Sequence, residues 1–216
     1  MQIQFISKSL IAVLLATQLS ACGILAVGGV AAGATVMADR RTPGVLAIDN
    51  GIELQANAAL SKKFGDNAHI NVTSFNQKVL LTGEAKDADI KGEADAYVKA
   101  MKNARTVFNE IVVGPNSTYT ARANDSYLES KIKTQMIFTD KLPSNSMSIV
   151  AEGTSVYLMG ILTQNEADLA KKVASNTNGV KDVYVYFDII SDAEKNRLEK
   201  QGKADESQPN SPPKFQ

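Results

Sequence analysis

The amino-acid sequence predicts an α+β protein made of two tandem domains that share one order of helices and strands. The main observation is an internal repeat, because the chain resembles itself when it is shifted by about 76 residues. Three pairs of segments match in this shift: 49–60 with 125–136, 79–83 with 156–160, and 106–109 with 182–185. In each copy, helical periodicity comes first and strand-like alternation follows. Each copy is therefore expected to be αββαβ, with two helices packed on a three-stranded mixed sheet.

Each copy is expected to begin with an amphipathic helix. Asp49 and Asp125 open the two helical patterns, and aspartate is a common N-cap residue because its carboxylate accepts hydrogen bonds from free backbone N–H groups. Apolar residues then recur at i, i+4 and i+8, which places them on one face of a helix. They are Ile52, Ala56 and Leu60 in the first copy, and Leu128, Ile132 and Met136 in the second. These two stripes are expected to face the core.

Two strands joined by a polar turn are expected after each first helix. Their ranges are 68–74 and 78–83 in the first copy, and 147–151 and 155–160 in the second. Gly83 and Gly160 are expected to end the second strand of each pair, at points where the chain bends or packs closely against backbone.

A second helix and a final strand complete each copy. The helices are expected at 87–102 and 164–177, and the final strands at 105–113 and 181–190. The first copy lacks the glycine that precedes this last strand in the second copy, and reads Lys102-Asn103-Ala104-Arg105 instead. Asparagine tolerates the left-handed backbone conformation, so the same turn is expected in both copies.

An apolar N-terminal segment leads to Cys22, the only cysteine of the chain. Lys8 supplies positive charge and residues 9–19 supply an apolar stretch of signal-peptide length. The small residues before the cysteine resemble a bacterial lipobox, which predicts lipid attachment at Cys22. An uncleaved anchor is the alternative, because residues 9–38 are long enough to span a bilayer, although glycines interrupt this run. Gly23 in place of Asp resembles the outer-membrane sorting pattern. A lipid-anchored outer-membrane protein that faces the periplasm is therefore expected, and exposure on the cell surface is the alternative.

The sequence divides into five expected parts. They are a signal peptide at 1–21, a lipidated Gly/Ala-rich linker at 22–43, the first domain at 44–114, the second domain at 123–190, and a polar tail at 191–216. The linker, including Asp39 to Pro43, is expected to lie outside the folded domains. The tail lacks Val, Ile, Tyr and Trp, so it is expected to be disordered, with at most a short helical extension over Ser191–Gln201.

The repeated copies resemble the BON domain, a small module of bacterial envelope proteins. The resemblance rests on the first helix, the V-x-L-x-G turn and the closing strand that begins at Gly179-Val180. Segments shared with BON relatives are 69–73, 78–81, 109–111 and Asn124-Asp125. Two such copies behind a lipobox, covering residues 44–190, resemble outer-membrane lipoproteins with two BON domains.

The resemblance implies binding, not catalysis. Lipoproteins of this kind are described as binding anionic phospholipid through the first helix of the second BON domain, gathering at the division site and supporting outer-membrane integrity. The alternative is an envelope adaptor whose BON domains dock a protein partner, such as outer-membrane assembly machinery or a regulator of cell-wall hydrolysis. Neither hypothesis requires a cofactor.

The first helix of the second copy has a surface suited to lipid. Tyr127, Lys131, Thr134 and Phe138 fall within about 60° on a helical wheel, roughly 130° from the core stripe. Tyrosine favours membrane interfaces, and a lysine stem can carry its ammonium group to phosphates. The expected phospholipid-binding residues are Tyr127, Leu128, Lys131, Lys133, Thr134 and Phe138. Packing of the aromatic side chains against the first domain is the alternative.

Composition and motifs argue against other functions. The chain has 23 basic and 23 acidic residues, so no basic excess favours nucleic acid as a partner. His69 is the only histidine, which rules out a His-His or Cys-His metal pair and makes a catalytic triad improbable. No Gly-rich phosphate loop follows a strand and opens a helix. Neither an enzyme nor a metal protein is expected, and the sequence leaves the oligomeric state open.

Overall fold

The computed structural model describes residues 39–207. The expected signal peptide, Cys22 and most of the linker lie outside the described residues, as does the end of the tail from residue 208. Both repeated copies fall within one compact unit, Val36–Gln216. Among the described residues, no helix is both long and apolar enough to cross a membrane.

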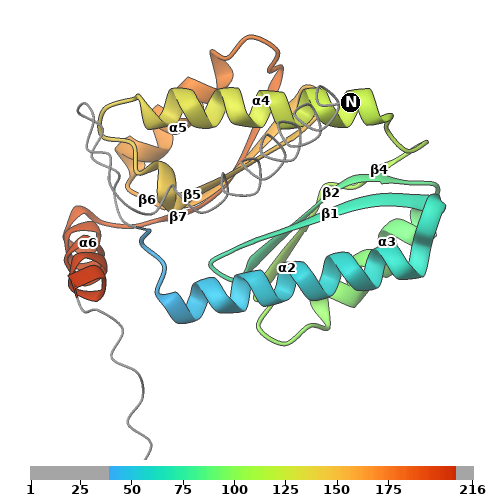
Figure 1. Ribbon diagram of the computed structural model, residues 1–216, viewed down its shortest axis with the longest axis horizontal. Helices are drawn as coiled ribbons and strands as arrows, with labels where there is room; N and C mark the ends of the chain where they lie inside the picture. Colours follow the sequence, from blue (N-terminus) through green and yellow to red (C-terminus); the bar gives the residue numbers. More distant parts are fainter. Residues whose placement is uncertain (1–38, 208–216) are drawn as a thin grey trace, which may run out of the picture. The chain divides into compact units, whose positions relative to one another are not determined.

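The first copy is an α+β domain in which a mixed sheet carries two helices on one face (Figure 1). Its strands run in the order β1-β2-β3, and the short β4 also pairs with β2. β1 and β2 are antiparallel, whereas β2 is parallel to both β3 and β4. The elements are α2 (Pro43–Phe64), the 3-10 helix η3 (Gly65–Asn67), β1 (Ala68–Phe75), β2 (Lys78–Ala85), α3 (Ala88–Lys99), β3 (Thr106–Asn109) and β4 (Val112–Val113).

The second copy repeats this arrangement with a simpler sheet (Figure 1). Its strand order is β5-β6-β7, antiparallel between the first two and parallel between the last two. The elements are α4 (Tyr119–Ile137), the 3-10 helix η4 (Ser144–Ser146), β5 (Met147–Glu152), β6 (Ser155–Leu162), α5 (Gln164–Ser175) and β7 (Asp182–Ile189). A further helix, α6 (Asp192–Ser207), follows. The predicted α+β class and the αββαβ order of both copies are confirmed.

Each copy has its own apolar core between the helices and the sheet. The two predicted helical stripes are buried, and each joins the core of its own copy. In β2, Val79 and Leu81 point into the first core, while Leu80 between them points to the opposite face. This alternation follows from the two-residue period of a strand.

A third apolar cluster joins the two copies. Phe75 and Leu80 of the first copy pack there with four residues of the second: Val150, Tyr157, Met159 and Ile161. The Phe108 ring stacks on Tyr186 with the ring centroids 4.1 Å apart. The sheet faces that carry no helix therefore provide the contact between the copies.

The structure corrects the predicted helix starts. α2 and α4 begin at Pro43 and Tyr119, where the hydroxyls of Thr42 and Thr118 accept hydrogen bonds from the first turn. Asp49 and Asp125 lie inside these helices and are buried. Their carboxylates instead accept hydrogen bonds from the β-hairpin turns: Asp49 from the N–H groups of Asn76 and Gln77, and Asp125 from that of Gly153.

The two glycines expected at the strand ends are also placed differently from the prediction. Gly83 and Gly160 lie within β2 and β6, which continue for two further residues. Gly83 has a φ of 99°, and a Cβ atom there would lie 2.0 Å from the carbonyl oxygen of His69. A Cβ atom at Gly160 would lie 2.9 Å from the Ser146 carbonyl oxygen. These glycines permit close strand packing, and they do not end their strands.

The turn before the last strand agrees with the sequence, but the strand itself does not in the first copy. Asn103 has a φ of 75°, and Gly179 has a φ of 110°, so asparagine provides the left-handed turn. The predicted strand over 105–113 is split into β3 and β4. The side chain of Asn109 accepts a hydrogen bond from the N–H group of Ile111, which closes a local turn at the break.

The linker end and the tail are more ordered than the sequence predicts. Arg40 is buried, and its guanidinium group forms ion pairs with Glu166 at 2.7 Å and with Glu199 of α6 at 2.8 Å. Lys195 of α6 also pairs with Glu166, at 2.8 Å, and Leu198 packs against the third apolar cluster. The end of the expected linker, residues 40–43, therefore contacts the second domain, and the helical extension considered for Ser191–Gln201 is present as α6 and continues to Ser207.

Candidate functional site

An exposed aromatic stripe runs along α4. Tyr119, Tyr127 and Phe138 have 88%, 68% and 78% of their surface exposed. At 100° per residue, these three positions span about 100° on the helical wheel. The buried stripe of Leu128, Ile132 and Met136 is centred on the opposite side. The three aromatic side chains are thus not needed to fill the core. The name α4 face is used below for the surface formed by Tyr119, Tyr127, Lys131, Thr134 and Phe138.

Tyr119 extends this face by two helical turns beyond the predicted residues. The sequence prediction missed it because it started the helix at Asp125. Thr118, whose hydroxyl accepts from the N–H group of Ala121 at 3.2 Å, is the N-cap signal that would have found the true start.

The predicted phospholipid-binding residues divide between surface and interior. Leu128 is only 7% exposed and belongs to the core, so its assignment to the lipid-binding set is wrong. Thr134 is exposed and donates its hydroxyl to the Ser130 carbonyl at 2.8 Å. Lys131 reaches across to the Asn178 carbonyl, with 3.0 Å between Nζ and oxygen.

Lys133 is a poorer candidate for lipid contact than the sequence implied. It is half-buried, and its ammonium group donates to the carbonyl of Ser144. Burial lowers the pKa of Lys133. Its charge is therefore directed into the domain, whereas Lys131 lies on the same side of the helical wheel as Tyr127 and Phe138.

The acidic residues of α4 do not point to its exposed face. Asp125 and Glu129 accept hydrogen bonds from the backbone N–H groups of Gly153 and Ala151, each at 2.8 Å. Burial raises the pKa of both carboxyls. Among the residues described for α4, no exposed side chain is acidic, so the helix itself presents no exposed carboxylate to an anionic surface.

The equivalent helix of the first copy has a different surface. Its only large exposed hydrophobic residue in the described structure is Leu54. The positions that correspond to Tyr127, Lys131, Thr134 and Phe138 are Gly51, Gln55, Ala58 and Lys62. The fold is shared, but the aromatic face belongs to α4 alone.

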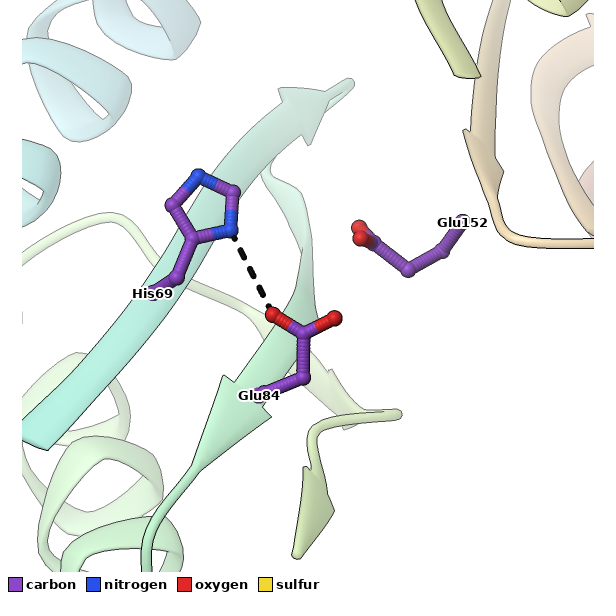
Figure 2. Close-up of side chains that lie close together, drawn as sticks. All are labelled: His69, Glu84 and Glu152. Carbon is purple, nitrogen blue, oxygen red and sulfur yellow. Dashed lines mark ion pairs between the residues drawn. The ribbon is translucent and has the colours of Figure 1, made fainter. Parts of the chain in front are cut away.

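A second cluster of chemically active side chains lies at the contact of the two copies. His69 of β1 and Glu84 of β2 are paired in the sheet, and Glu152 ends β5 (Figure 2). The Nδ1 atom of His69 lies 3.6 Å from Glu84. One ligand-type atom from each of the three residues lies within 4.8 Å of the others.

The charges of this cluster are strongly influenced by burial. Burial lowers the pKa of His69, and the nearby charge of Arg122 adds to this effect. Burial and the neighbouring carboxylates Glu84 and Asp125 raise the pKa of Glu152 to about 7. His-His and Cys-His pairs are the usual sequence signals of a metal site, and a single histidine completed by two distant carboxylates gives no such signal.

Comparisons with known proteins agree with the repeat. The BON domain family matches residues 49–115 and 124–190. The outer membrane lipoprotein DolP of Haemophilus influenzae is 30% identical over 174 residues, which cover 80% of this chain and 90% of that protein. The 21 kDa hemolysin of Actinobacillus pleuropneumoniae is 29% identical over 154 residues, or 70% of this chain and 79% of that protein.

Solved structures add little. CdsD, a structural protein of the type III secretion system of Chlamydia trachomatis, is 13% identical and covers 69% of this chain and 68% of that one, with a TM-score of 0.27. Such a low score supports no conclusion about this protein.

Proposed function

The chain belongs to the BON domain family, and we propose that it is an outer-membrane lipoprotein that binds anionic phospholipid through the α4 face. In this proposal Cys22 carries the lipid anchor, the BON domains lie in the periplasm, and the protein supports outer-membrane integrity, including at the division site. The relationship to an outer membrane lipoprotein supports the location. The observation that supports lipid binding is the exposed aromatic stripe of α4.

The chemistry of the α4 face suits a membrane interface. Partial burial of a tyrosine or phenylalanine among headgroups contributes on the order of 1–3 kcal/mol by apolar area, less the cost of ordering the side chains. The hydroxyl groups of Tyr119 and Tyr127 can stay hydrogen-bonded to water while the rings enter the headgroup layer. Lys131 adds attraction to phosphates of about 1 kcal/mol near an anionic surface.

A lipid anchor would make even a weak contact effective. The residues between Cys22 and Arg40 span at most about 60 Å when fully extended. Arg40 is fixed to the second domain by Glu166, so the tether ends on the same domain that carries α4. A second binding event at such short range benefits from a high effective concentration.

Vesicle binding tests this proposal directly. The unacylated chain of residues 23–216 is used, so that acyl chains make no contribution. We expect it to co-sediment with vesicles of equal parts phosphatidylglycerol and phosphatidylcholine, and to bind pure phosphatidylcholine at least tenfold more weakly. Equal or absent binding to both vesicles would contradict the proposal.

The edge strand β7 favours a second candidate function, that of an envelope adaptor. In the described structure β7 pairs only with β6, and its residues Tyr184, Val185 and Ile189 are exposed. An edge strand with exposed apolar side chains is a surface on which a partner strand can add. The adaptor function would be favoured if the chain did not bind lipid vesicles but did retain a periplasmic protein through β7.

A further inference from the structure

We propose that His69, Glu84 and Glu152 bind a divalent transition-metal ion of the zinc class, and that this ion links the two BON domains. The first two ligands come from the first domain and the third comes from the second (Figure 2). This metal site is independent of the α4 face and of the proposed lipid binding.

The sheet register brings two of the ligands together. His69 and Glu84 are directly opposite each other on the antiparallel pair β1–β2, so their side chains project from the same face of the sheet. The two ligand atoms of this pair are 3.6 Å apart. A tetrahedral zinc ion with bonds of 2.0–2.1 Å needs its ligand atoms about 3.3–3.4 Å apart, so this pair already has nearly the required spacing.

Glu152 approaches from the second domain to complete the set. Its carboxylate faces the other two side chains (Figure 2), and all three ligand atoms lie within 4.8 Å of one another. Three protein ligands would leave a fourth position for water.

Two further observations favour a cation at this position. The Nδ1 atom of His69 is buried and has no hydrogen-bond partner among the described residues, although buried polar atoms are nearly always paired. Glu84 is held in place by the Ser117 hydroxyl, at 3.1 Å, in the manner of an outer residue that orients a metal ligand. An imidazole nitrogen with two carboxylates is a donor set that suits zinc.

A bound ion would stabilise the contact between the domains. Without it, two carboxylates from different domains face each other across the contact, with Asp125 adding further negative charge. A divalent cation converts this repulsion into attraction. A metal ion that binds the folded chain but not the unfolded chain would raise the stability of the protein by mass action.

Zinc titration of residues 23–216 tests the site, because this chain has no thiol to compete and is purified without a polyhistidine tag. Calorimetry is expected to give one zinc ion per chain with a dissociation constant in the micromolar range or tighter. Since His69 is the only histidine, NMR of the wild-type chain shows a single set of imidazole signals. Saturating zinc is expected to shift these signals in the pattern of Nδ1 coordination.

Variants separate the site from unspecific binding. His69→Ala and Glu152→Gln are each expected to weaken zinc binding at least tenfold while the circular dichroism spectrum stays unchanged. Glu93→Gln is the matched control, because Glu93 is an exposed glutamate paired with Lys63 outside the cluster, and it should bind zinc like the wild type. Zinc that binds only at millimolar concentration, that leaves the imidazole signals unshifted, or that binds His69→Ala equally well would overturn the proposal.

Discussion

Tyr127 and Leu128 are neighbours in the chain and serve opposite surfaces of α4. Tyr127 is 68% exposed, whereas Leu128 is 7% exposed and packs in the core. The rotation of 100° per residue along a helix causes this separation. Substitutions at the two positions should therefore affect different properties of the protein, one its binding and the other its stability.

Replacement of Tyr127 by glutamate is expected to weaken binding to phosphatidylglycerol-containing vesicles at least tenfold. The change removes apolar area from the α4 face and adds a charge that the anionic surface repels. Lys131→Glu should weaken binding less, and its effect should shrink at high salt. Co-sedimentation of the unacylated chain measures both variants.

Gln55→Glu is the control for Tyr127→Glu and Lys131→Glu, because Gln55 occupies the position of Lys131 in the first copy. It should leave lipid binding intact. The thermal midpoint of Tyr127→Glu should remain close to that of the wild type. An unfolded Tyr127→Glu chain whose folded fraction binds lipid normally would show that the lipid surface lies elsewhere.

Leu128→Ala should lower stability and leave lipid binding intact, which is the reverse of the effect expected for Tyr127→Glu. Truncation of this buried leucine is expected to reduce the free energy of unfolding by about 2–5 kcal/mol, because it leaves a cavity in the core. Urea unfolding followed by circular dichroism measures the loss. Vesicle binding by the folded fraction should be unchanged, and a loss of binding at full stability would return Leu128 to the lipid-binding set.

At the scale of elements, an aspartate of each first helix binds the turn region of the hairpin beside it. Asp49 accepts hydrogen bonds from Ser74 at 2.8 Å, Asn76 at 2.9 Å and Gln77 at 2.8 Å. Asp125 accepts one from Gly153 at 2.8 Å. Asn76 and Gln77 have positive φ angles of 53° and 65°, so their turn needs this support. The repeated aspartate therefore fixes the helix to the turn in both copies.

Asp49→Ala is expected to lower the free energy of unfolding by about 3 kcal/mol, because it leaves several buried hydrogen-bond donors unpaired. Asp125→Ala removes one such bond and should lower it by about 1 kcal/mol. Urea unfolding of the two variants gives the comparison. An equal loss at both positions would mean that the aspartates do not act through their hairpin turns.

Sequence periodicity predicted the order of elements and both core stripes, since these depend on local spacing alone. The role of Asp49 and Asp125 was missed because aspartate is also a common N-cap residue, although Thr42 and Thr118 are earlier N-cap candidates that mark the true helix starts. The pairing of His69 with Glu84 follows from the register of a hairpin, but the approach of Glu152 depends on how the two copies pack. Periodicity contains no information about that contact.

At the scale of the whole molecule, Arg40 joins three parts of the chain. Its guanidinium group bonds to Glu166 of the second domain and to Glu199 of α6. Arg40 itself lies at the end of the segment that follows Cys22. The contact therefore fixes the base of the expected lipid tether, and the sequence could not predict it because Arg40 and Glu166 are 126 positions apart.

Cys22→Ala is expected to abolish acylation and to leave a precursor that still carries residues 1–21. The thioether to lipid needs the cysteine sulfur, and removal of the signal peptide in lipoproteins follows that modification. Labelling with a fatty-acid probe and the mass of the protein measure both effects. A processed and labelled Cys22→Ala chain would show that the anchor is elsewhere.

Acid is expected to release the contact between Arg40, Glu166 and α6. Burial by itself raises the pKa of Glu166, but Arg40 and Lys195 outweigh it and lower the pKa to about 2. A carboxyl whose pKa is lower in the folded state contributes stability above its unfolded pKa of about 4.3. That contribution is lost as pH falls from about 5 towards 2.

Urea unfolding at pH 7, 5 and 3 measures this loss in the wild type and in Glu166→Gln. The variant lacks the titrating group, so it should be less stable at pH 7 and should lose less stability on acidification than the wild type. Because the pKa of Glu166 in the folded chain is about 2, its carboxylate stays mostly ionised in the folded wild type at pH 3, so the NMR signals of α6 should report loosened contacts in Glu166→Gln already at pH 7. If both chains lose stability equally between pH 5 and pH 3, then Glu166 is not the group that holds the tether and α6 to the second domain.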